Sequence, residues 1–339
     1  MNFIQLPKMN LRIIKAGVLD TVQDMGRYGY QQLGINPGGV MDRWAAQTAN
    51  ILVGNKKDAA VIELHFPASE IFFEKPVLIS VCGADFSPHV NAEEIPCWQP
   101  VLVNRYSILQ FYGMKEGARA YLAIHGGIDV GKWLNSFSTN LKAVAGGYKG
   151  RCFQKEDEIP VQDLSVELLS VLNKTEFIIL PWKAGKIIDD ETEILIMEGN
   201  EWNRLDNNSK RNFLQQQFTI RPNSDRMGYR LQAETLYATA NEEIVSSAVS
   251  FGTVQFLPDG QLIVLMADHQ TTGGYPRVAH VISAHHSKLA QMKAGEKFIF
   301  RLTDQKTAEE LLIKQQQHLL QLQNACTFRL QDYINANRH

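Results

Sequence analysis

Residues 262–281 read Leu-Ile-Val-Leu-Met-Ala-Asp-His-Gln-Thr-Thr-Gly-Gly-Tyr-Pro-Arg-Val-Ala-His-Val. The apolar run over residues 262–267 is short and aliphatic, which predicts a buried β-strand. Asp268 follows at once, with two threonines, two glycines and a tyrosine behind it. Glycines let a ligand approach the main chain closely, so this stretch is a candidate binding site at the end of a strand. A polar hairpin turn is the alternative, and composition alone does not separate the two.

The residues before this stretch predict the strand's partner. Residues 252–256 form a second, largely apolar run, and Pro258-Asp259-Gly260 separates it from the strand that ends at Ala267. Pro-Asp-Gly between two apolar runs is a strong hairpin signal. The hairpin would present residues 268–275 at its far end.

Strand signals dominate the rest of the chain as well. Six short segments between residues 59 and 123 are apolar or alternating, and turns separate them at a spacing typical of a β-sandwich or β-barrel. Helix signals are few. One helix is expected from Asp42, a candidate N-cap, to Gly54, and another behind a capping box at residues 307–310. The patterning weakens over residues 161–185, which we interpret as a linker.

Two polar loops resemble each other in content. Residues 23–30 and residues 223–231 each combine an acid, an arginine and glycine after a predicted strand. The two halves are therefore interpreted as related barrels, with chance similarity as the alternative. We expect a domain over residues 1–185, a second over residues 186–303, and a helical tail over residues 304–339.

The composition excludes several classes of protein. The 339 residues are 45% hydrophobic and 21% charged, with a formal net charge of -2, so no basic excess is present for general binding of nucleic acid or anionic membranes. The four cysteines form no Cys-x-x-Cys pair, which argues against a disulfide framework or a zinc site. No signal peptide and no apolar run of about 20 residues is recognisable, so we expect a cytoplasmic protein with no membrane partner.

The absence of common catalytic motifs narrows the chemistry. The sequence has no phosphate loop, no dinucleotide-binding glycine motif, no His-Glu-x-x-His and no nucleophile elbow. Carboxylate, amide, hydroxyl and arginine groups on glycine-rich loops remain. Such groups suit a small polar carbonyl or carboxylate compound, and Asp268 or Asp24 can orient a water or take a proton.

Several motifs together resemble one protein family. They are Thr-Val-Gln-Asp-Met-Gly-Arg-Tyr-Gly at residues 21–29, Gly-Val-Met-Asp at 39–42, Ala-Asn-Ile-Leu-Val-Gly-Asn at 49–55, Ser-Asp-Arg-Met-Gly-Tyr-Arg-Leu at 224–231, and Asp-His-Gln-Thr-Thr-Gly-Gly-Tyr-Pro at 268–276. In this order they resemble the allophanate hydrolase subunit 2 family, from about residue 17 to residue 300. Within the family the similarity is to the group of 5-oxoprolinase C subunits, also called KipA.

The resemblance implies a mainly β fold of two cyclophilin-like β-barrel halves, with a few helices and a C-terminal helix. It implies work with the A and B subunits of 5-oxoprolinase, of which the B subunit is KipI-like. Together the three convert 5-oxo-L-proline, ATP and water to L-glutamate, ADP and phosphate, and ATP is a co-substrate of the complex. Two alternatives stay open. The first is the carboxyltransferase component of a biotin-dependent urea carboxylase. The second is a non-enzymatic regulator that binds a kinase inhibitor.

The family motifs and the glycine loops together predict the site residues. Asp268 and Asp24 are the expected catalytic residues, and no metal is expected. The expected substrate-binding residues are Gln23, Arg27, Arg226, Thr271, Thr272, Gly273, Gly274 and Tyr275. One loop departs from the family pattern: Asn-Ser-Phe-Ser-Thr at residues 135–139 stands where Gly-Ser-Arg-Ser-Thr is usual. The hydroxyl-rich loop at residues 135–140 is interpreted either as an anion-binding loop or as an ordinary solvated loop. Phe137 removes a charge there, which argues against the anion-binding role.

Overall fold

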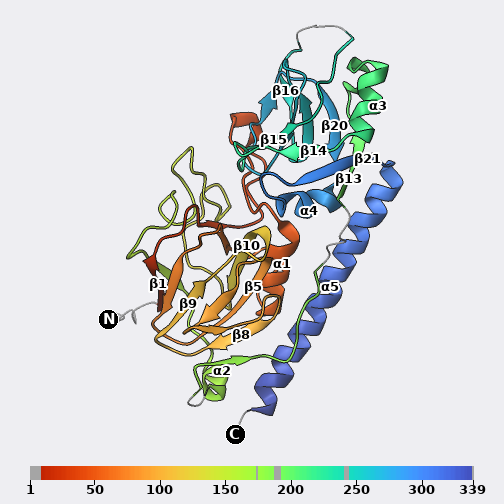
Figure 1. Ribbon diagram of the computed structural model, residues 1–339. Helices are drawn as coiled ribbons and strands as arrows, with labels where there is room; N and C mark the ends of the chain where they lie inside the picture. The colour runs from red at the N-terminus through yellow and green to blue at the C-terminus, as the bar shows by residue number, and fades with distance from the viewer. Residues whose placement is uncertain (1–8, 173–174, 187–191, 240–243, 338–339) are drawn as a thin grey trace. The chain divides into compact units, whose positions relative to one another are not determined.

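The computed structural model describes residues 9–172, 175–186, 192–239 and 244–337 (Figure 1). The chain forms two compact units. The first unit contains residues 1–26, 42–186 and 318–339, and the second contains residues 27–41 and 187–317. The segment 27–41 therefore belongs with the unit that carries Asp268, and the C-terminal helix is shared between the units. The prediction of a mainly β protein with few helices is confirmed.

Two six-stranded sheets build the first unit. In spatial order, the first sheet contains β11 (Glu158–Val161), β1 (Met9–Lys15), β4 (Glu70–Phe73), β9 (Ser107–Phe111), β6 (Pro88–Val90) and β7 (Glu93–Glu94). The second contains β12 (Phe177–Ile179), β8 (Pro100–Val103), β5 (Val77–Asp85), β10 (Glu116–Ile124), β3 (Val61–Leu64) and β2 (Thr21–Gln23). One hydrophobic core contains side chains of both sheets.

Strand β5 shows how the second sheet is covered on both faces. Val77, Ile79 and Val81 lie in the core shared by the two sheets. Ser80 points the other way, because side chains alternate along a strand, and its hydroxyl donates to the carbonyl of Ala49 at 2.6 Å. That carbonyl belongs to helix α1 (Arg43–Leu52), which lies against β5 and β10 (Figure 1). Asp42 caps α1 as predicted, since the amide N–H of Ala45 donates to Asp42 Oδ1 at 2.9 Å.

The interpretation of residues 161–185 as a linker was wrong. This segment forms helix α2 (Val166–Val171) and strand β12, which pairs with β8 and so extends the second sheet of the first unit. A three-residue edge strand is too short for its periodicity to be recognised. Its placement depends on main-chain hydrogen bonds, such as the one that Asn104 N–H donates to the carbonyl of Glu176 at 2.8 Å.

The second unit is a closed seven-stranded barrel. Its strands in spatial order are β13 (Glu193–Glu198), β20 (Arg277–Val281), β17 (Thr253–Phe256), β18 (Leu262–Leu265), β15 (Gly228–Gln232), β14 (Phe218–Ile220) and β21 (Lys297–Leu302). A two-stranded ribbon of β16 (Ser247–Ala248) and β19 (Thr272–Gly273) completes its strands. The predicted hairpin is confirmed, because β17 pairs with β18 from Phe256 opposite Leu262 onward.

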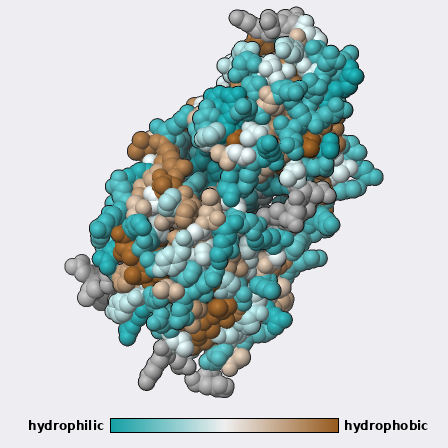
Figure 2. Space-filling model, viewed as in Figure 1, coloured by the Kyte–Doolittle hydropathy of each residue, from teal (hydrophilic) through white to brown (hydrophobic). Residues whose placement is uncertain are grey.

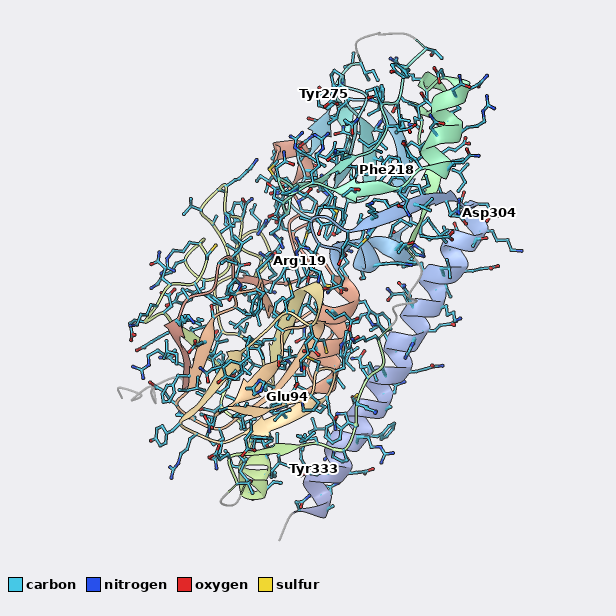
Figure 3. The ribbon with its side chains drawn as sticks, in the orientation of Figure 1. Glu94, Arg119, Phe218, Tyr275, Asp304 and Tyr333 are labelled. Atoms are coloured by element: carbon cyan, nitrogen blue, oxygen red, sulfur yellow. The ribbon has the colours of Figure 1, made fainter. Side chains whose placement is uncertain are left out.

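Aromatic side chains fill much of the barrel. Phe218 lies inside it and is 1% exposed, whereas Tyr275 lies at its outer edge and is 44% exposed (Figure 3). Helix α3 (Asn207–Gln215) covers β21, and Phe213 of this helix stacks on Phe300 with ring centroids 5.0 Å apart. The remaining short helices are η1 (Gln31–Leu33), η2 (Trp202–Arg204), η3 (Ser283–His285) and α4 (His286–Ala290).

Helix α5 (Gln305–Ala336) ends the described chain. Its N-terminus is capped by Asp304, whose Oδ1 accepts from Thr307 N–H at 2.7 Å. The predicted capping box at residues 307–310 was therefore placed three residues late. Apolar side chains of the first turns pack with Ile282 and Ala284 of the second unit, and His318 meets the Trp44 ring of the first unit edge-on.

The surface carries no large apolar face in the view of Figure 2. Hydrophilic residues dominate that view, and apolar residues gather in small separate patches (Figure 2). Among the described helices, none has an apolar stretch long enough to span a membrane.

Candidate functional site

The polar residues after β18 are held by a loop that precedes β15. The main chain of Asp268 donates to the carbonyl of Arg226 at 2.8 Å, and the side chains of the same two residues form a bidentate ion pair. Arg226 Nε lies 2.9 Å from Asp268 Oδ2, and Nη2 lies 3.1 Å from Oδ1. The Arg226 side chain is 6% exposed and that of Asp268 is 19% exposed. The carboxylate therefore has a fixed orientation and still reaches solvent.

The glycine turn at residues 38 and 39 completes this cluster. Arg226 Nη2 also donates to the carbonyl of Gly39 at 2.6 Å. Gly38 has a φ of +61°, and a Cβ at this position would lie 3.0 Å from Arg27 Nη1 and 3.6 Å from Asp268 Oδ1. The turn thus needs glycine both for its backbone conformation and for space. It gathers Arg27, Arg226 and Asp268, a group with two positive charges and one negative charge.

Asp24 of the first unit is surrounded by uncharged donors instead. Its Oδ1 accepts from Ser136 Oγ and Ser138 Oγ, each at 2.6 Å, and from Gly26 N–H at 2.8 Å. Its Oδ2 accepts from Phe137 N–H at 2.6 Å. A carboxylate has about four acceptor positions, and these four donors occupy most of them. The geometry suits an anchor for the loop around Phe137.

The same contacts bear on the proposed anion-binding role of residues 135–140. The hydroxyls of Ser136 and Ser138 donate to Asp24, so an anion would have to displace a carboxylate of the protein. Gln23, which is 1% exposed, donates to Thr21 Oγ1 at 3.0 Å and lies 3.4 Å from the carbonyl of Thr139. Its Oε1 has no hydrogen-bond partner among the described residues. The loop is therefore fixed to β2 and to Asp24.

The predicted residues thus fall into two groups. Gln23 and Asp24 belong to the first unit, whereas Arg27, Arg226, Asp268 and residues 271–275 belong to the second. Within the second unit, Thr272, Gly274 and Tyr275 are exposed and Gly273 is buried. The carbonyl of Thr271 accepts from Val249 N–H at 3.2 Å, beside the pairing of β16 with β19.

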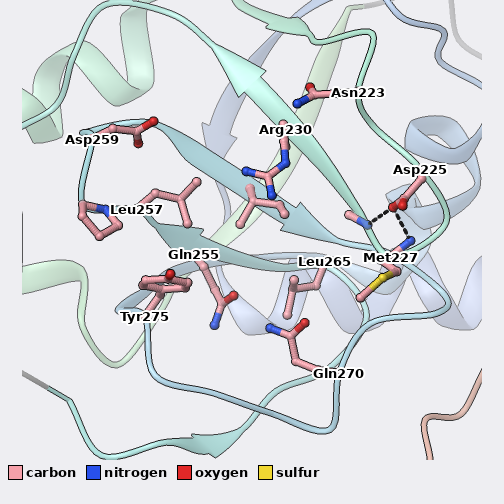
Figure 4. Close-up of a pocket in the computed structure, with 13 residues that line it drawn as sticks. Asn223, Asp225, Met227, Arg230, Gln255, Leu257, Asp259, Leu265, Gln270 and Tyr275 are labelled. Atoms are coloured by element: carbon pink, nitrogen blue, oxygen red, sulfur yellow. Dashed lines mark hydrogen bonds between the residues drawn. The ribbon is translucent and has the colours of Figure 1, made fainter.

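A pocket of about 540 Å³ lies next to this segment in the second unit. Tyr275 is the sole member of the predicted set that lines it. Sequence reasoning missed its other polar lining residues, which include Asp225, Arg230, Gln255, Asp259 and Gln270 (Figure 4). A signal for one of them was present: Gln255 is a polar residue inside the apolar run that forms β17, where all four residues are buried.

Histidines and metal ligands add little to this site. His269 is 3% exposed, and burial lowers its pKa, so the ring is neutral at neutral pH. Its Nδ1 lies 2.5 Å from the carbonyl of Gln270. Within the described ranges, no group of three or more His, Cys, Asp or Glu side chains is arranged to hold a metal ion.

Comparison with known proteins identifies a family that spans most of the chain. Residues 33–302 match the family described as carboxyltransferase domain, subdomain A and B. The 5-oxoprolinase C subunit of Haemophilus influenzae is 34% identical over 302 residues, which cover 89% of this chain and 94% of that protein. The 5-oxoprolinase C subunit of Escherichia coli is 33% identical over 290 residues, which cover 86% of this chain and 90% of that protein.

Solved structures show the same fold inside larger proteins. The crystal structure of the Kluyveromyces lactis urea amidolyase superimposes with a TM-score of 0.85 and 26% identity, over 95% of this chain. This chain spans 20% of that protein. The crystal structure of TTHA0988 superimposes with a TM-score of 0.74 and 25% identity, over 88% of this chain and 56% of that one.

Proposed function

We infer the function of this chain from the family to which it belongs, that of the carboxyltransferase domain with subdomains A and B. We propose that it is the C subunit of an ATP-dependent 5-oxoprolinase. The proposed complex opens the lactam ring of 5-oxo-L-proline to L-glutamate while ATP becomes ADP and phosphate. The proposed partners are the A subunit of that enzyme and its KipI-like B subunit, and the proposed compartment is the cytoplasm.

The observation that carries this proposal is a correspondence over whole chains. The match covers 94% of the Haemophilus influenzae C subunit, whereas it covers 17% of the urea amidolyase of Saccharomyces cerevisiae. The identity is also higher to that C subunit, at 34%, than to the urea amidolyase, at 27%, and both differences support the oxoprolinase function.

The chemistry of the substrate explains the need for ATP. An unstrained lactam resists hydrolysis, because its nitrogen lone pair is delocalised into the carbonyl group. Transfer of the γ-phosphoryl group of ATP to the lactam oxygen releases ADP and creates a leaving group. Over the whole reaction one water cleaves the ring C–N bond and a second is consumed in forming free phosphate. The chain has no phosphate-loop motif, so ATP enters this proposal as a co-substrate of the complex.

The residues of the second unit take distinct roles in the proposal. Asp268 orients the attacking water or accepts its proton, and Arg226 holds the carboxylate in place. Arg27 adds positive charge beside the same turn, where a carboxylate or phosphate group would be attracted. The segment 271–275 contacts the substrate through its exposed residues, Thr272, Gly274 and Tyr275. In the first unit, Gln23 stays a candidate for substrate binding and Asp24 a candidate catalytic residue, although the contacts of Asp24 chiefly suit an anchor for the loop around Phe137.

The test is release of ADP and L-glutamate from 5-oxo-L-proline and ATP. The purified chain is assayed by itself, with the B subunit, and with the A and B subunits together. We expect turnover in the complete mixture and none from the chain by itself. Omission of this chain from the mixture is the matched control. Full activity of the A and B subunits without this chain would contradict the proposal.

One observation favours a second candidate, the carboxyltransferase component of a biotin-dependent urea carboxylase. The chain superimposes closely on part of a urea amidolyase, and the family description names a carboxyltransferase domain. Carboxyl transfer from carboxybiotin to urea by this chain, with no oxoprolinase turnover, would establish that function instead. Tight binding to the B subunit without either activity would identify a non-enzymatic regulator of a kinase inhibitor.

A further inference from the structure

We propose that the pocket on the outer face of the barrel binds a small cyclic amide that also carries a carboxylate, with Arg230 holding the carboxylate and Gln255 holding the amide. The inference rests on the proposed function for the identity of the ligand, 5-oxo-L-proline. It assigns the binding site to residues outside the catalytic cluster around Asp268.

Strand register places the two polar residues in one row. Arg230 of β15 lies opposite Ile263 of β18, and Ile263 lies opposite Gln255 of β17. The neighbours along these strands, such as Tyr229 and Val254, fill the barrel core, so the row faces outward. Adjacent strands are about 4.8 Å apart, which puts the Cα atoms of Arg230 and Gln255 about 10 Å from each other. A small ring fits between their side chains, above Ile263.

Gln255 is the group that points to a ligand. It is 1% exposed, and its Nε2 has no hydrogen-bond partner among the described residues. A buried amide without a partner is unfavourable, and this amide lines the pocket. Figure 4 shows it near Tyr275 and Gln270, among the residues that line the pocket. A lactam presents its C=O and N–H on the same edge, and a carboxamide such as that of Gln255 complements both.

Gly273 explains how Gln255 keeps this position. A Cβ at residue 273 would lie 2.4 Å from Gln255 Nε2. The ribbon strand β19 can therefore cover Gln255 because residue 273 has no side chain. The sequence predicted that a ligand approaches Gly273 closely, and in the structure the side chain of Gln255 makes such an approach.

Arg230 is the cation of the pocket. Its guanidinium makes no hydrogen bond or ion pair with any residue that the structure describes, and its side chain is exposed at the pocket. The carboxylates of Asp225 and Asp259 also line the pocket, and each accepts hydrogen bonds from the main chain. Asp225 Oδ1 accepts from the amide N–H groups of Met227 and Gly228, and Asp259 Oδ1 accepts from that of Gln261. Arg230 is thus available for a ligand carboxylate, and Ile263, Leu257 and Leu265 offer an apolar surface to the ring.

The test crosses two variants with three ligands. Binding to the full chain is measured by ligand-observed NMR titration for 5-oxo-L-proline, 2-pyrrolidone and cyclopentanecarboxylate. The first ligand has both groups, the second lacks the carboxylate and the third lacks the lactam. For 5-oxo-L-proline we expect Arg230→Gln and Gln255→Met each to weaken binding about tenfold or more. Arg230→Gln should leave 2-pyrrolidone binding unchanged, and Gln255→Met should leave that of cyclopentanecarboxylate unchanged.

Two further variants keep the result interpretable. Arg211→Gln, an exposed arginine of α3 outside the pocket, should bind 5-oxo-L-proline like the unaltered chain. Gly273→Ala should weaken binding as Gln255→Met does, which guards against a folding defect caused by a buried methionine. No binding of 5-oxo-L-proline, or equal weakening by Arg211→Gln and Arg230→Gln, would overturn the inference.

The outcome is separable from that of the proposed function. If the complete complex kept its normal KM and kcat with Arg230→Gln and with Gln255→Met, the assignment of the pocket as the binding site would be wrong, and the proposed oxoprolinase function would still stand. If the ligands bound with the expected pattern but the complete complex showed no turnover, the assignment of the pocket would stand and the proposed oxoprolinase function would be wrong.

Discussion

Asp24 and Asp268 each follow a strand in a glycine-containing loop, yet the protein treats the two carboxylates differently. Asp24 is 6% exposed and accepts four hydrogen bonds, all from hydroxyl and main-chain N–H groups. Asp268 has a side chain that is 19% exposed and accepts from one guanidinium. Uncharged donors enclose the first carboxylate, and a charged donor orients the second toward solvent.

This difference separates an anchoring role from a chemical one. A carboxylate whose acceptor positions are occupied by the protein has little capacity left for water or substrate. A carboxylate held on one side by a bidentate arginine keeps its remaining lone pairs for another partner. We therefore expect substitutions at Asp24 to act mainly on stability and those at Asp268 mainly on turnover.

The largest expected effect is on turnover after Asp268→Asn. The amide keeps the shape of the carboxylate and cannot accept a proton, so turnover of the complete complex should fall about 100-fold to 10,000-fold. The measurement is kcat of the reconstituted complex, with unfolding of the isolated chain followed in urea.

The barrel offers a matched control for this variant. Glu201 forms a bidentate pair with Arg277 at 2.8 and 3.0 Å, and their side chains are 16% and 18% exposed. Glu201→Gln should lower the stability of the chain about as much as Asp268→Asn, by about 1 to 2 kcal/mol, and leave kcat unchanged. Equal kcat values for the two variants would show that Asp268 is not a catalytic residue.

The next effect in size is the stability loss of Asp24→Asn. The asparagine NH₂ group would face at least one of the four donors from which Asp24 now accepts. Loss of these charge-assisted bonds in a buried site should lower the free energy of unfolding by about 3 kcal/mol, measured by urea denaturation. Asp58→Asn, at an exposed position, is the control. Unchanged stability with lost turnover would instead support Asp24 as a catalytic residue.

A third aspartate sharpens the comparison through its pH dependence. Asp20 is 1% exposed and accepts from the amide N–H groups of His65 and Ser69 at 2.8 and 2.6 Å. Burial raises the pKa of Asp20 from 3.8 to about 6, against the effect of these bonds and with a smaller contribution from Glu63. The folded state therefore binds a proton that the unfolded state has released between these two pH values.

The sign of the effect follows from this proton. Where the folded state binds more protons, stability falls as the pH rises. Asp20 should thus lower the free energy of unfolding by about 2 kcal/mol between about pH 4.5 and pH 6.5. The difference in stability between these pH values, measured by urea denaturation, should shrink by that amount in Asp20→Asn and not in Asp58→Asn. An identical pH dependence in all three chains would contradict the prediction.

Local patterns predicted local structure well. The hairpin around Pro258-Asp259-Gly260 and the cap of α1 by Asp42 depend on residues within a few positions of each other. The cap of α5 was misplaced because Asp304 and Thr307 both satisfy the same local rule. Strand β12 was missed because its partner, β8, supplies the stabilising hydrogen bonds from far along the chain.

The candidate site shows the same limit. The motifs indicated Asp24, Arg226 and Asp268, and not what each of them contacts. Three of the four donors to Asp24 lie 112 to 114 residues away in the sequence, so the sequence around Asp24 does not show that its carboxylate is enclosed. The row from Arg230 to Gln255 depends on the register of three strands, which periodicity does not reveal.

The smallest expected effect is the stability loss of Ser136→Ala, which tests whether several donors together stabilise the carboxylate of Asp24. Ser136→Ala removes one of three donors to Oδ1 and one acceptor for Ser138 N–H. Because the other donors stay in place, the stability loss in urea denaturation should be about 1 kcal/mol. Ser170→Ala, at an exposed hydroxyl that donates to the carbonyl of Glu167, should change stability by less. Ser136→Ala combined with Ser138→Ala should lose more than the sum of the single variants, since residues in one hydrogen-bond network couple. If Ser136→Ala alone destabilised the chain as much as Asp24→Asn, a single donor would hold the carboxylate of Asp24, as Arg226 holds that of Asp268. The proposed difference between the two carboxylates would then be wrong.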